Sequence, residues 1–124
     1  MRLADVGVLD AVTTTAFFTY LDELLADWLA PAIGSDWVTL HAEVDLLAEV
    51  RRVHRTLSGR IELERTGRSS ITARAELLRD DDVRAVRALY VVAAWDPATR
   101  RSRPLTESER AMLAGSPSAA GHSA

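Results

Sequence analysis

The segment from Thr13 to Ala30 most limits what this 124-residue chain can fold into, because it predicts one long amphipathic helix among segments that mostly resemble strands. Its apolar side chains recur every three or four residues and form one broad helical stripe: Phe17, Phe18, Leu21, Leu24, Leu25, Trp28 and Leu29. Such a stripe needs a large apolar surface opposite it. The later segments alternate with a period of two and would supply that surface as a sheet. We therefore expect an α+β fold in which an antiparallel sheet wraps around one long central α-helix.

Four later segments have strand patterns: residues 37–46, 57–64, 69–78 and 83–95. The alternation in the first of them predicts one core-facing set: Val38, Leu40, Ala42, Val44 and Leu46. The last segment is apolar on both faces from Ala88 onward. It predicts either a central strand or a strand that another subunit covers, with Val91, Ala93 and Trp95 facing outward.

Turn and cap residues separate these elements. Pro31, Gly34 and Ser35 mark the exit of the long helix, which we expect to run from Thr13 to Ala30. Residues 66–68 and the acidic residues 80–82 predict two turns between strands. Residues 2–8 are compatible with a short first strand, and Thr106 begins a T-x-x-E capping box that predicts a short terminal helix.

The length allows one domain with a single core, which we assign to residues 1–114. Residues 115–124 are low in complexity and predict a disordered tail. No apolar run approaches the ~18 residues of a membrane span, and no signal-peptide pattern begins the chain. We therefore expect a cytoplasmic protein with no membrane contact.

Composition excludes several kinds of site. The net charge of −3 gives no basic field for nucleic acid, and the absence of cysteine excludes thiolate nucleophiles and disulfides. The three histidines, at 41, 54 and 122, are too far apart in sequence to indicate a metal motif. His41, Glu43 and Asp45 share the polar face of one predicted strand, but without a fourth ligand they favour a solvated face or a dimer contact. All fifteen basic residues are Arg, whose planar fork matches phosphate.

The best chemical candidate on the long helix is Asp22. At about 100° per residue, it falls at the edge of the apolar stripe beside Phe18, whereas Asp27 falls on the solvated side. Partial burial at that edge would suit the carboxylate to act as a base or nucleophile. The alternative is that Asp22 is one more surface acid on a helix that carries several.

The start of the helix is the second candidate. Asp10 precedes it, and Thr13 and Thr14 lie where the chain enters it. Residues of these types cap helices, and the free N–H groups at a helix start can also polarise a carbonyl group. Capping and polarisation are compatible roles.

The order of a short strand, a long helix and four antiparallel strands resembles the hotdog fold of acyl-CoA thioesterases, from Arg2 to about Leu113. In the 4-hydroxybenzoyl-CoA thioesterase-like branch, the entry reads approximately R-Y-x-D-x-D-x-x-G-H-V-N-N-x-x-Y-x-x-Y-x-E. The stretch RLADVGVLDAVTTTAFFTYLD fits this pattern without a gap, through Arg2, Asp5, Val12, Phe17, Tyr20 and Asp22. The end of the chain, WDPATRRSRPLTESERAML, is also similar to the close of that family.

The chain departs from this branch at its chemical positions. The usual catalytic Asp of the family falls on Gly7, and its G-H falls on Asp10 and Ala11. Its paired Asn residues fall on Thr13 and Thr14. On this alignment the standard acid is missing.

A second branch, similar to phenylacetate-pathway thioesterases, reads V-H-G-G-x-x-x-x-x-x-D-E near the helix. The stretch VTTTAFFTYLDE places Asp22 on the mid-helix acid that is catalytic in that branch, with Thr in place of the His and both Gly. VDLLAEV also matches a strand of this branch, and GRSS at 67–70 resembles a strand start that lies near the CoA side of the groove in both branches.

The resemblance implies an acyl thioesterase that acts on an acyl-CoA or acyl-carrier-protein thioester between two subunits, as a homodimer or a dimer of dimers, and without a cofactor. In this reading the amides around Thr13 and Thr14 polarise the carbonyl group, and Asp22 activates water or attacks directly, with Asp10 as the competing acid. Phe17 and Phe18 line the acyl groove, and Arg52 and Arg68 meet the CoA phosphates.

Two other functions remain open. A hotdog dehydratase or hydratase would need a His and Asp pair near the helix, but no His precedes His41. A non-catalytic hotdog subunit that binds acyl groups, or serves a structural role, is favoured by Gly7, Ala11 and the threonines. Hydrolysis of a panel of acyl-CoA chain lengths would separate the enzyme from the binder.

Overall fold

The computed structural model describes residues 14–51 and 56–115, and the backbone of 118–123. Its elements are α1 (Thr14–Ile33), β1 (Trp37–Leu46), β2 (Thr56–Thr66), β3 (Ser70–Arg79), β4 (Arg84–Asp96), β5 (Arg101–Ser102), α2 (Glu107–Ala114) and β6 (Ser118–Ser123). The four strands predicted after the long helix are confirmed as β1 to β4. The predicted first strand over residues 2–8 lies outside the described residues.

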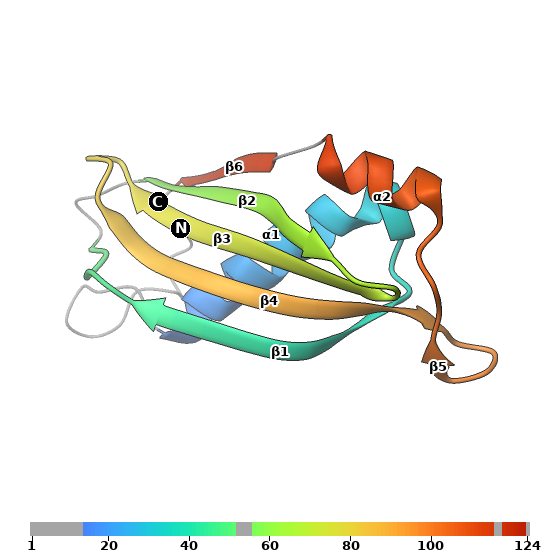
Figure 1. The fold of residues 1–124 in the computed structure, drawn as a ribbon. Helices are drawn as coiled ribbons and strands as arrows, with labels where there is room; N and C mark the ends of the chain where they lie inside the picture. The colour runs from blue at the N-terminus through green and yellow to red at the C-terminus, as the bar shows by residue number, and fades with distance from the viewer. Residues whose placement is uncertain (1–13, 52–55, 116–117, 124) are drawn as a thin grey trace.

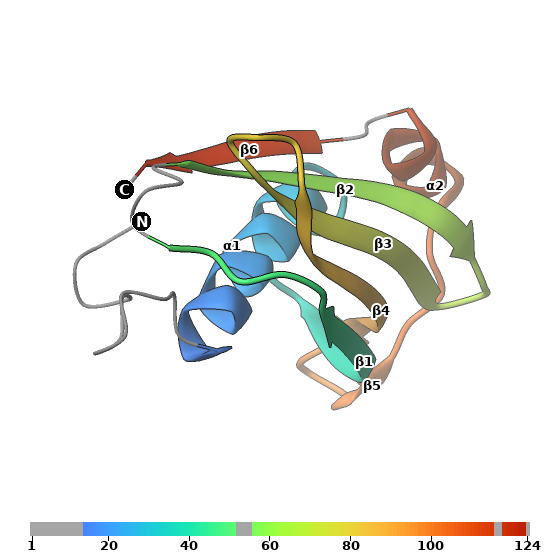
Figure 2. The ribbon, with the colours of Figure 1, turned by 90° about the vertical axis from the view of Figure 1, so that its left-hand side faces the viewer.

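The sheet is antiparallel, with the strand order β1-β4-β3-β2-β6, and β5 pairs with β4 beyond this path. Figure 1 shows α1 lying behind the sheet, and Figure 2 shows the sheet curving around the helix. The predicted fold, a sheet wrapped around one long helix, is therefore confirmed. The short helix α2 packs against one end of α1 and against β2.

The apolar stripe of α1 forms the centre of the core. Leu21 and Leu29 are fully buried, and Phe17 and Trp28 are each 5% exposed. The strands supply the opposite wall through side chains that alternate toward the helix, including Leu57, Ile61, Ile71, Leu77, Val86 and Val92. This packing of period-two faces against a helical stripe is the physical reason for the fold.

The sequence predicted that the helix ends at Ala30, before Pro31, but the helix is longer. It continues to Ile33, which is 7% exposed, and ends where Gly34 adopts a positive φ of 64° and donates its N–H to the Ala30 carbonyl. A proline in the last turn keeps a helical φ and loses only one hydrogen bond, which burial of Ile33 offsets. Glycine tolerates the left-handed conformation that closes the helix.

The predicted facing of β1 is corrected by a bulge. The strand has the predicted bounds, but its register with β4 shifts between Thr39 and His41, which leaves Leu40 as the extra residue. Trp37 consequently packs toward the core, and Leu40 is 61% exposed. Because the bulge adds one residue to β1, the residues before Leu40 face the opposite way from the expected alternation, whereas those after it keep the expected facing.

β4 is a central strand, as predicted, with β1 on one side and β3 on the other. Its core-facing side chains include Ala88 and Tyr90. Of the three residues expected to face outward, Val91 and Trp95 are partly exposed, whereas Ala93 is only 2% exposed. The outward apolar surface is thus smaller than the sequence predicted.

The C-terminal elements confirm one expectation and correct another. The Thr106 side chain accepts a hydrogen bond from the Glu109 N–H, and the Glu109 side chain accepts one from the Thr106 N–H, which is the predicted capping box of α2. The tail expected to be disordered contains β6, which pairs with β2. The free edge of β2 offers backbone partners that small residues can reach without any apolar pattern of their own.

Candidate active site

Asp22 lies on one flank of α1, four residues after Phe18 on the same side of the helix. Both side chains are exposed, and Phe18 is 44% exposed. Asp22 was expected to be partly buried, and in the single chain it is not. Phe17, by contrast, is buried in the core, so the two neighbouring aromatic rings have different surroundings.

The sheet does not cover this flank at β1. Ala42 and Leu46 lie opposite Tyr90 and Val86 of β4, so they face the helix side of the sheet, yet both are exposed. The packing partners of α1 are chiefly β2 and α2. Phe18 and Asp22 of the helix are thus exposed, as are Ala42 and Leu46 on the helix side of β1, and we call these four residues the α1–β1 strip.

Tyr90 lies in the core beside this strip. Its side chain is 3% exposed, and its hydroxyl oxygen has no hydrogen-bond partner among the described residues. Burial raises the pKa of Tyr90 to about 12, and the negative charge of Asp22 acts in the same direction. The Asp22 carboxylate therefore lies within electrostatic range of the buried hydroxyl.

The helix start has one described candidate. Thr14 is exposed and is the first residue of α1, so its N–H has no acceptor inside the helix. Thr13 and Asp10, the other candidates at this end, lie outside the described residues. Asp22 is eight residues further along the helix, which corresponds to roughly 12 Å.

Of the two arginine candidates, the one that the structure describes, Arg68, is not brought to this place in one chain. Arg52 lies outside the described residues, and Arg68 is exposed in the turn between β2 and β3. The Arg68 carbonyl accepts hydrogen bonds from the Leu105 N–H and from the Arg110 side chain. This turn is at the end of the sheet where α1 finishes, whereas Thr14 is at the opposite end of the 20-residue helix. One chain alone therefore does not gather all of the predicted site residues.

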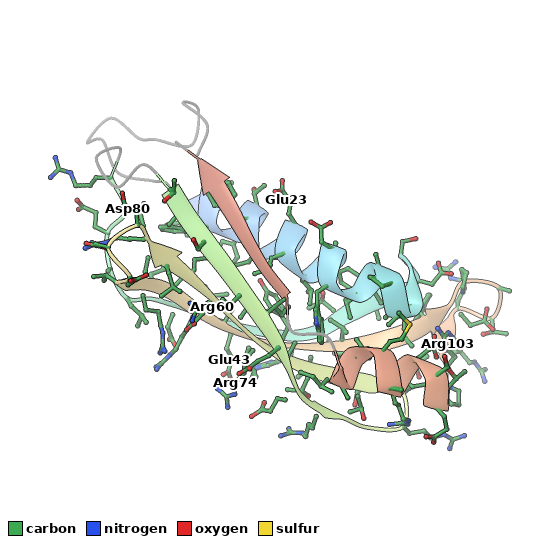
Figure 3. All side chains as sticks on the ribbon, turned by 90° about the horizontal axis from the view of Figure 1, so that it is seen from above. Glu23, Glu43, Arg60, Arg74, Asp80 and Arg103 are labelled. Carbon is green, nitrogen blue, oxygen red and sulfur yellow. The ribbon has the colours of Figure 1, made fainter. Side chains whose placement is uncertain are left out.

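A hollow of about 880 Å³ lies on the other face of the sheet, away from α1. Figure 3 shows Glu43, Arg60 and Arg74 on this side, with the helix on the other. Its arginines already have carboxylate partners: Arg87 with Asp45 at 2.9 Å, Arg74 with Glu64 at 2.8 Å, and both Arg60 and Arg84 with Glu76 at 3.7 and 2.8 Å. His41 meets Glu43 at 3.0 Å on the same face. The arginine and carboxylate side chains thus pair across the strands, as on a solvated sheet face. Asp22 does not line this hollow.

Comparison with known proteins decides the family. A family model described as the thioesterase superfamily matches residues 10–86, more than half of the 124-residue chain. The chain belongs to the thioesterase superfamily. It is therefore a thioester hydrolase, and the predicted resemblance to hotdog thioesterases is confirmed.

Solved thioesterases share the fold of this superfamily member. One from Thermus thermophilus, complexed with coenzyme A and Zn, is 19% identical with a TM-score of 0.80, and 91% of each chain is covered. A hexameric thioesterase from Yersinia pestis is 21% identical with a TM-score of 0.75, and the match covers 86% of this chain and 90% of that one. A 1,4-dihydroxy-2-naphthoyl-CoA thioesterase from Synechocystis is 16% identical with a TM-score of 0.75, covering 91% and 90%. No curated protein matches the chain.

The part of the chain that the structure describes offers neither a metal site nor a membrane-spanning helix. It contains no group of three or more His, Asp or Glu side chains arranged to hold a metal ion. In the same ranges, no helix has the length and apolar character needed to cross a membrane.

Sequence reasoning missed Tyr90. Its signal was a hydroxyl-bearing side chain at a core-facing position of the otherwise apolar strand β4, between Ala88 and Val92. A buried hydroxyl normally has a partner, so such a position raises the question of what the hydroxyl binds.

Proposed function

We propose that this thioesterase hydrolyses an acyl-CoA or acyl-carrier-protein thioester at a site between two subunits, with Asp22 as its catalytic carboxylate. The observation that carries the proposal is the α1–β1 strip, where the Asp22 carboxylate lies on an exposed helix flank beside an exposed phenylalanine, Phe18. A carboxylate can act as a base or nucleophile toward a thioester, and an exposed apolar side chain can contact the acyl chain. Phe18 contacts the acyl chain in this proposal, and Phe17 supports the helix from the core.

The reaction follows from these groups. Asp22 takes a proton from a water molecule while the hydroxide adds to the thioester carbonyl carbon. The resulting tetrahedral oxyanion collapses, the carbon–sulfur bond breaks, and the thiolate leaves and gains a proton, giving a carboxylic acid and a free thiol. Direct attack by the Asp22 carboxylate would instead give an acyl-enzyme anhydride, which water then hydrolyses. The N–H groups around Thr13 and Thr14 stabilise the oxyanion in either route.

A second subunit completes the site in this proposal. β1 is at the end of the sheet path, with β4 as its partner, and it exposes residues on both faces, including Leu40 and Leu46. An unpaired edge with apolar side chains supports pairing with another copy of the chain. Such pairing would bring the helix start or the Arg68 turn of one subunit toward Asp22 of the other, and Arg68, with Arg52, would meet the phosphates of CoA.

Asp22→Asn tests the proposal, because it keeps the shape of the side chain and removes its charge. Hydrolysis of an acyl-CoA panel, followed by free-thiol release, should fall by about a hundredfold or more while the folded state is retained. Asp27→Asn is the matched control, since Asp27 is an exposed acid on the other side of the same helix. It should leave the rate nearly unchanged.

Asp10→Asn distinguishes the alignment with the 4-hydroxybenzoyl-CoA thioesterase-like branch from the alignment with the phenylacetate-pathway branch. A large loss from Asp10→Asn alone, with Asp22→Asn active, would move the chemistry to the segment before the helix. A wild-type chain that binds acyl-CoA but releases no thiol would favour the non-catalytic acyl-binding subunit, which the replacement of the usual family Asp by Gly7 supports.

A further inference from the structure

The Tyr90 hydroxyl is buried without a hydrogen bond among the described residues that would offset its loss of hydration. A hydroxyl removed from water without a hydrogen bond is destabilising, so buried hydroxyls normally have partners. Among the described residues, the Tyr90 hydroxyl oxygen is the single buried side-chain oxygen or nitrogen without one. A phenylalanine would fill the same space without this cost.

The two strands beside Tyr90 differ in exposure at its level. Its neighbours across the ladder are Ala42 on β1 and Ala73 on β3, both small. Ala73 is 1% exposed, whereas Ala42 is exposed. The phenol therefore borders the α1–β1 strip and is closed off on the β3 side.

Asp22 limits what the hydroxyl can bind. The carboxylate acts on the phenol through its charge, yet no hydrogen bond joins the two groups among the described contacts. The phenol stays protonated near neutral pH and remains a donor. As a donor, the hydroxyl can bind a ligand that offers an acceptor, and a thioester carbonyl oxygen is such an acceptor.

We propose that the Tyr90 hydroxyl belongs to the acyl site and donates a hydrogen bond to the carbonyl oxygen of the bound thioester, beside the carboxylate of Asp22. This inference rests on the proposed function and adds a second group to it. Asp22 supplies the base or nucleophile, and Tyr90 orients the carbonyl group and stabilises the charge that develops on its oxygen. The alternative is a tyrosine that serves the core only through its ring.

Tyr90→Phe separates these roles, because it deletes the hydroxyl alone. The proposal predicts that kcat falls by about a hundredfold, the typical effect of losing one oxyanion donor, while KM rises only about fivefold through loss of the hydrogen bond to the bound carbonyl group. The melting temperature should stay the same or rise, because an unpaired buried hydroxyl is removed. Tyr20→Phe is the matched control: Tyr20 is 2% exposed and lies on the opposite flank of α1 from Asp22, so this variant should keep kcat.

Two results would overturn the inference. One is an unchanged kcat in Tyr90→Phe, and the other is a fall in kcat that comes with a marked fall in melting temperature, which would indicate a structural partner for the hydroxyl. Binding of a ketone analogue of acyl-CoA, with CH₂ in place of the thioester sulfur, is measured by calorimetry in the same variants. Tyr90→Phe should weaken it about fivefold and Tyr20→Phe should not.

The analogue also keeps the two proposals distinguishable. If the wild type hydrolyses no acyl thioester but binds the ketone with the predicted Tyr90 dependence, hydrolysis fails as the function and Tyr90 remains an acyl-binding group. If hydrolysis depends on Asp22 while neither rate nor binding depends on Tyr90, the proposed function holds and this inference fails. No binding and no hydrolysis would refute both.

Discussion

At the scale of single residues, the charge of Asp22 should be measurable in the titration of Tyr90. The pKa of the phenol is raised to about 12, first by burial and then by the Asp22 carboxylate. A negative charge disfavours formation of the phenolate, so Asp22→Asn should lower the pKa of Tyr90. Phenolate absorbance, taken as the difference between the wild type and Tyr90→Phe, follows this group alone.

The alkaline titration needs fast detection, because the same pKa shift destabilises the fold. The folded pKa lies above the ordinary value of 10.0, so stability is intact below about pH 10 and falls as the pH rises toward 12. A pH jump read within milliseconds observes the phenol before unfolding. Asp27→Asn is again the control and should not move the midpoint. An identical midpoint in Asp22→Asn would show that the two groups are not neighbours.

Replacing Phe17 by alanine should chiefly lower stability, whereas replacing Phe18 should chiefly change substrate preference. Phe17 is 5% exposed, so Phe17→Ala should lower the free energy of unfolding by about 3 kcal/mol or more. Phe18 is 44% exposed, so Phe18→Ala should cost much less stability and should change the preference among acyl chain lengths. Urea unfolding and rates across an acyl-CoA panel measure the two effects. Equal losses of stability with an unchanged chain-length profile would contradict the role of Phe18.

At the scale of elements, α2 carries an ion pair between Glu109 and Arg103, with an N–O distance of 2.7 Å. Glu109 accepts two hydrogen bonds from Arg103, at 2.7 and 2.8 Å, and one from the Thr106 N–H. Chiefly through the bond with Arg103, these contacts lower the pKa of Glu109 from 4.5 to about 2. The stabilisation is therefore complete above about pH 4.5 and is lost as the pH falls toward 2.

Glu109→Gln should remove this acid-dependent part of the stability. The free energy of unfolding, from urea titrations between pH 2 and pH 7, should depend less on pH between about 2 and 4.5 in this variant than in the wild type. Glu107→Gln, at an exposed position of the same helix, is the control and should keep the wild-type slope. If Glu109→Gln kept the full slope, the ion pair would not be the source of the acid sensitivity.

Individual elements also mark the limit of sequence reasoning. The bounds of β1 and the central place of β4 followed from hydrophobic periodicity, and the α2 cap followed from its motif. The bulge at Leu40 could not be predicted, because a bulge depends on which residues of β4 lie opposite. β6 was missed because it has no pattern of its own and depends on the free edge of β2.

At the scale of the whole molecule, periodicity was sufficient for the fold but not for the site. A period-two sheet has few ways to cover one broad helical stripe, so the architecture followed from local patterns. The site residues lie at distant places in the fold: Thr14 begins α1, and Arg68 is at the other end of the sheet. Whether they meet depends on a second copy, about which the pattern of one chain carries little information.

The last prediction concerns that second copy. If β1 is the contact edge, Leu40→Glu should separate the subunits, because Leu40 is 61% exposed at the bulge and a buried unpaired carboxylate is costly. Light scattering should find the wild type at a multiple of the 13.6 kDa chain mass and the variant at a lower multiple. Met112→Glu, which adds the same charge at a 46% exposed position on α2, should keep the wild-type mass.

Activity measured on the same samples tests whether the site is shared. If the helix start or the Arg68 turn of one subunit completes the site at Asp22 of another, thiol release should fall in parallel with the loss of the assembly in Leu40→Glu and stay unchanged in Met112→Glu. A wild type that is monomeric at micromolar concentration would refute the shared site. So would a dissociated Leu40→Glu variant with full activity, since one chain would then hold every group that the reaction needs.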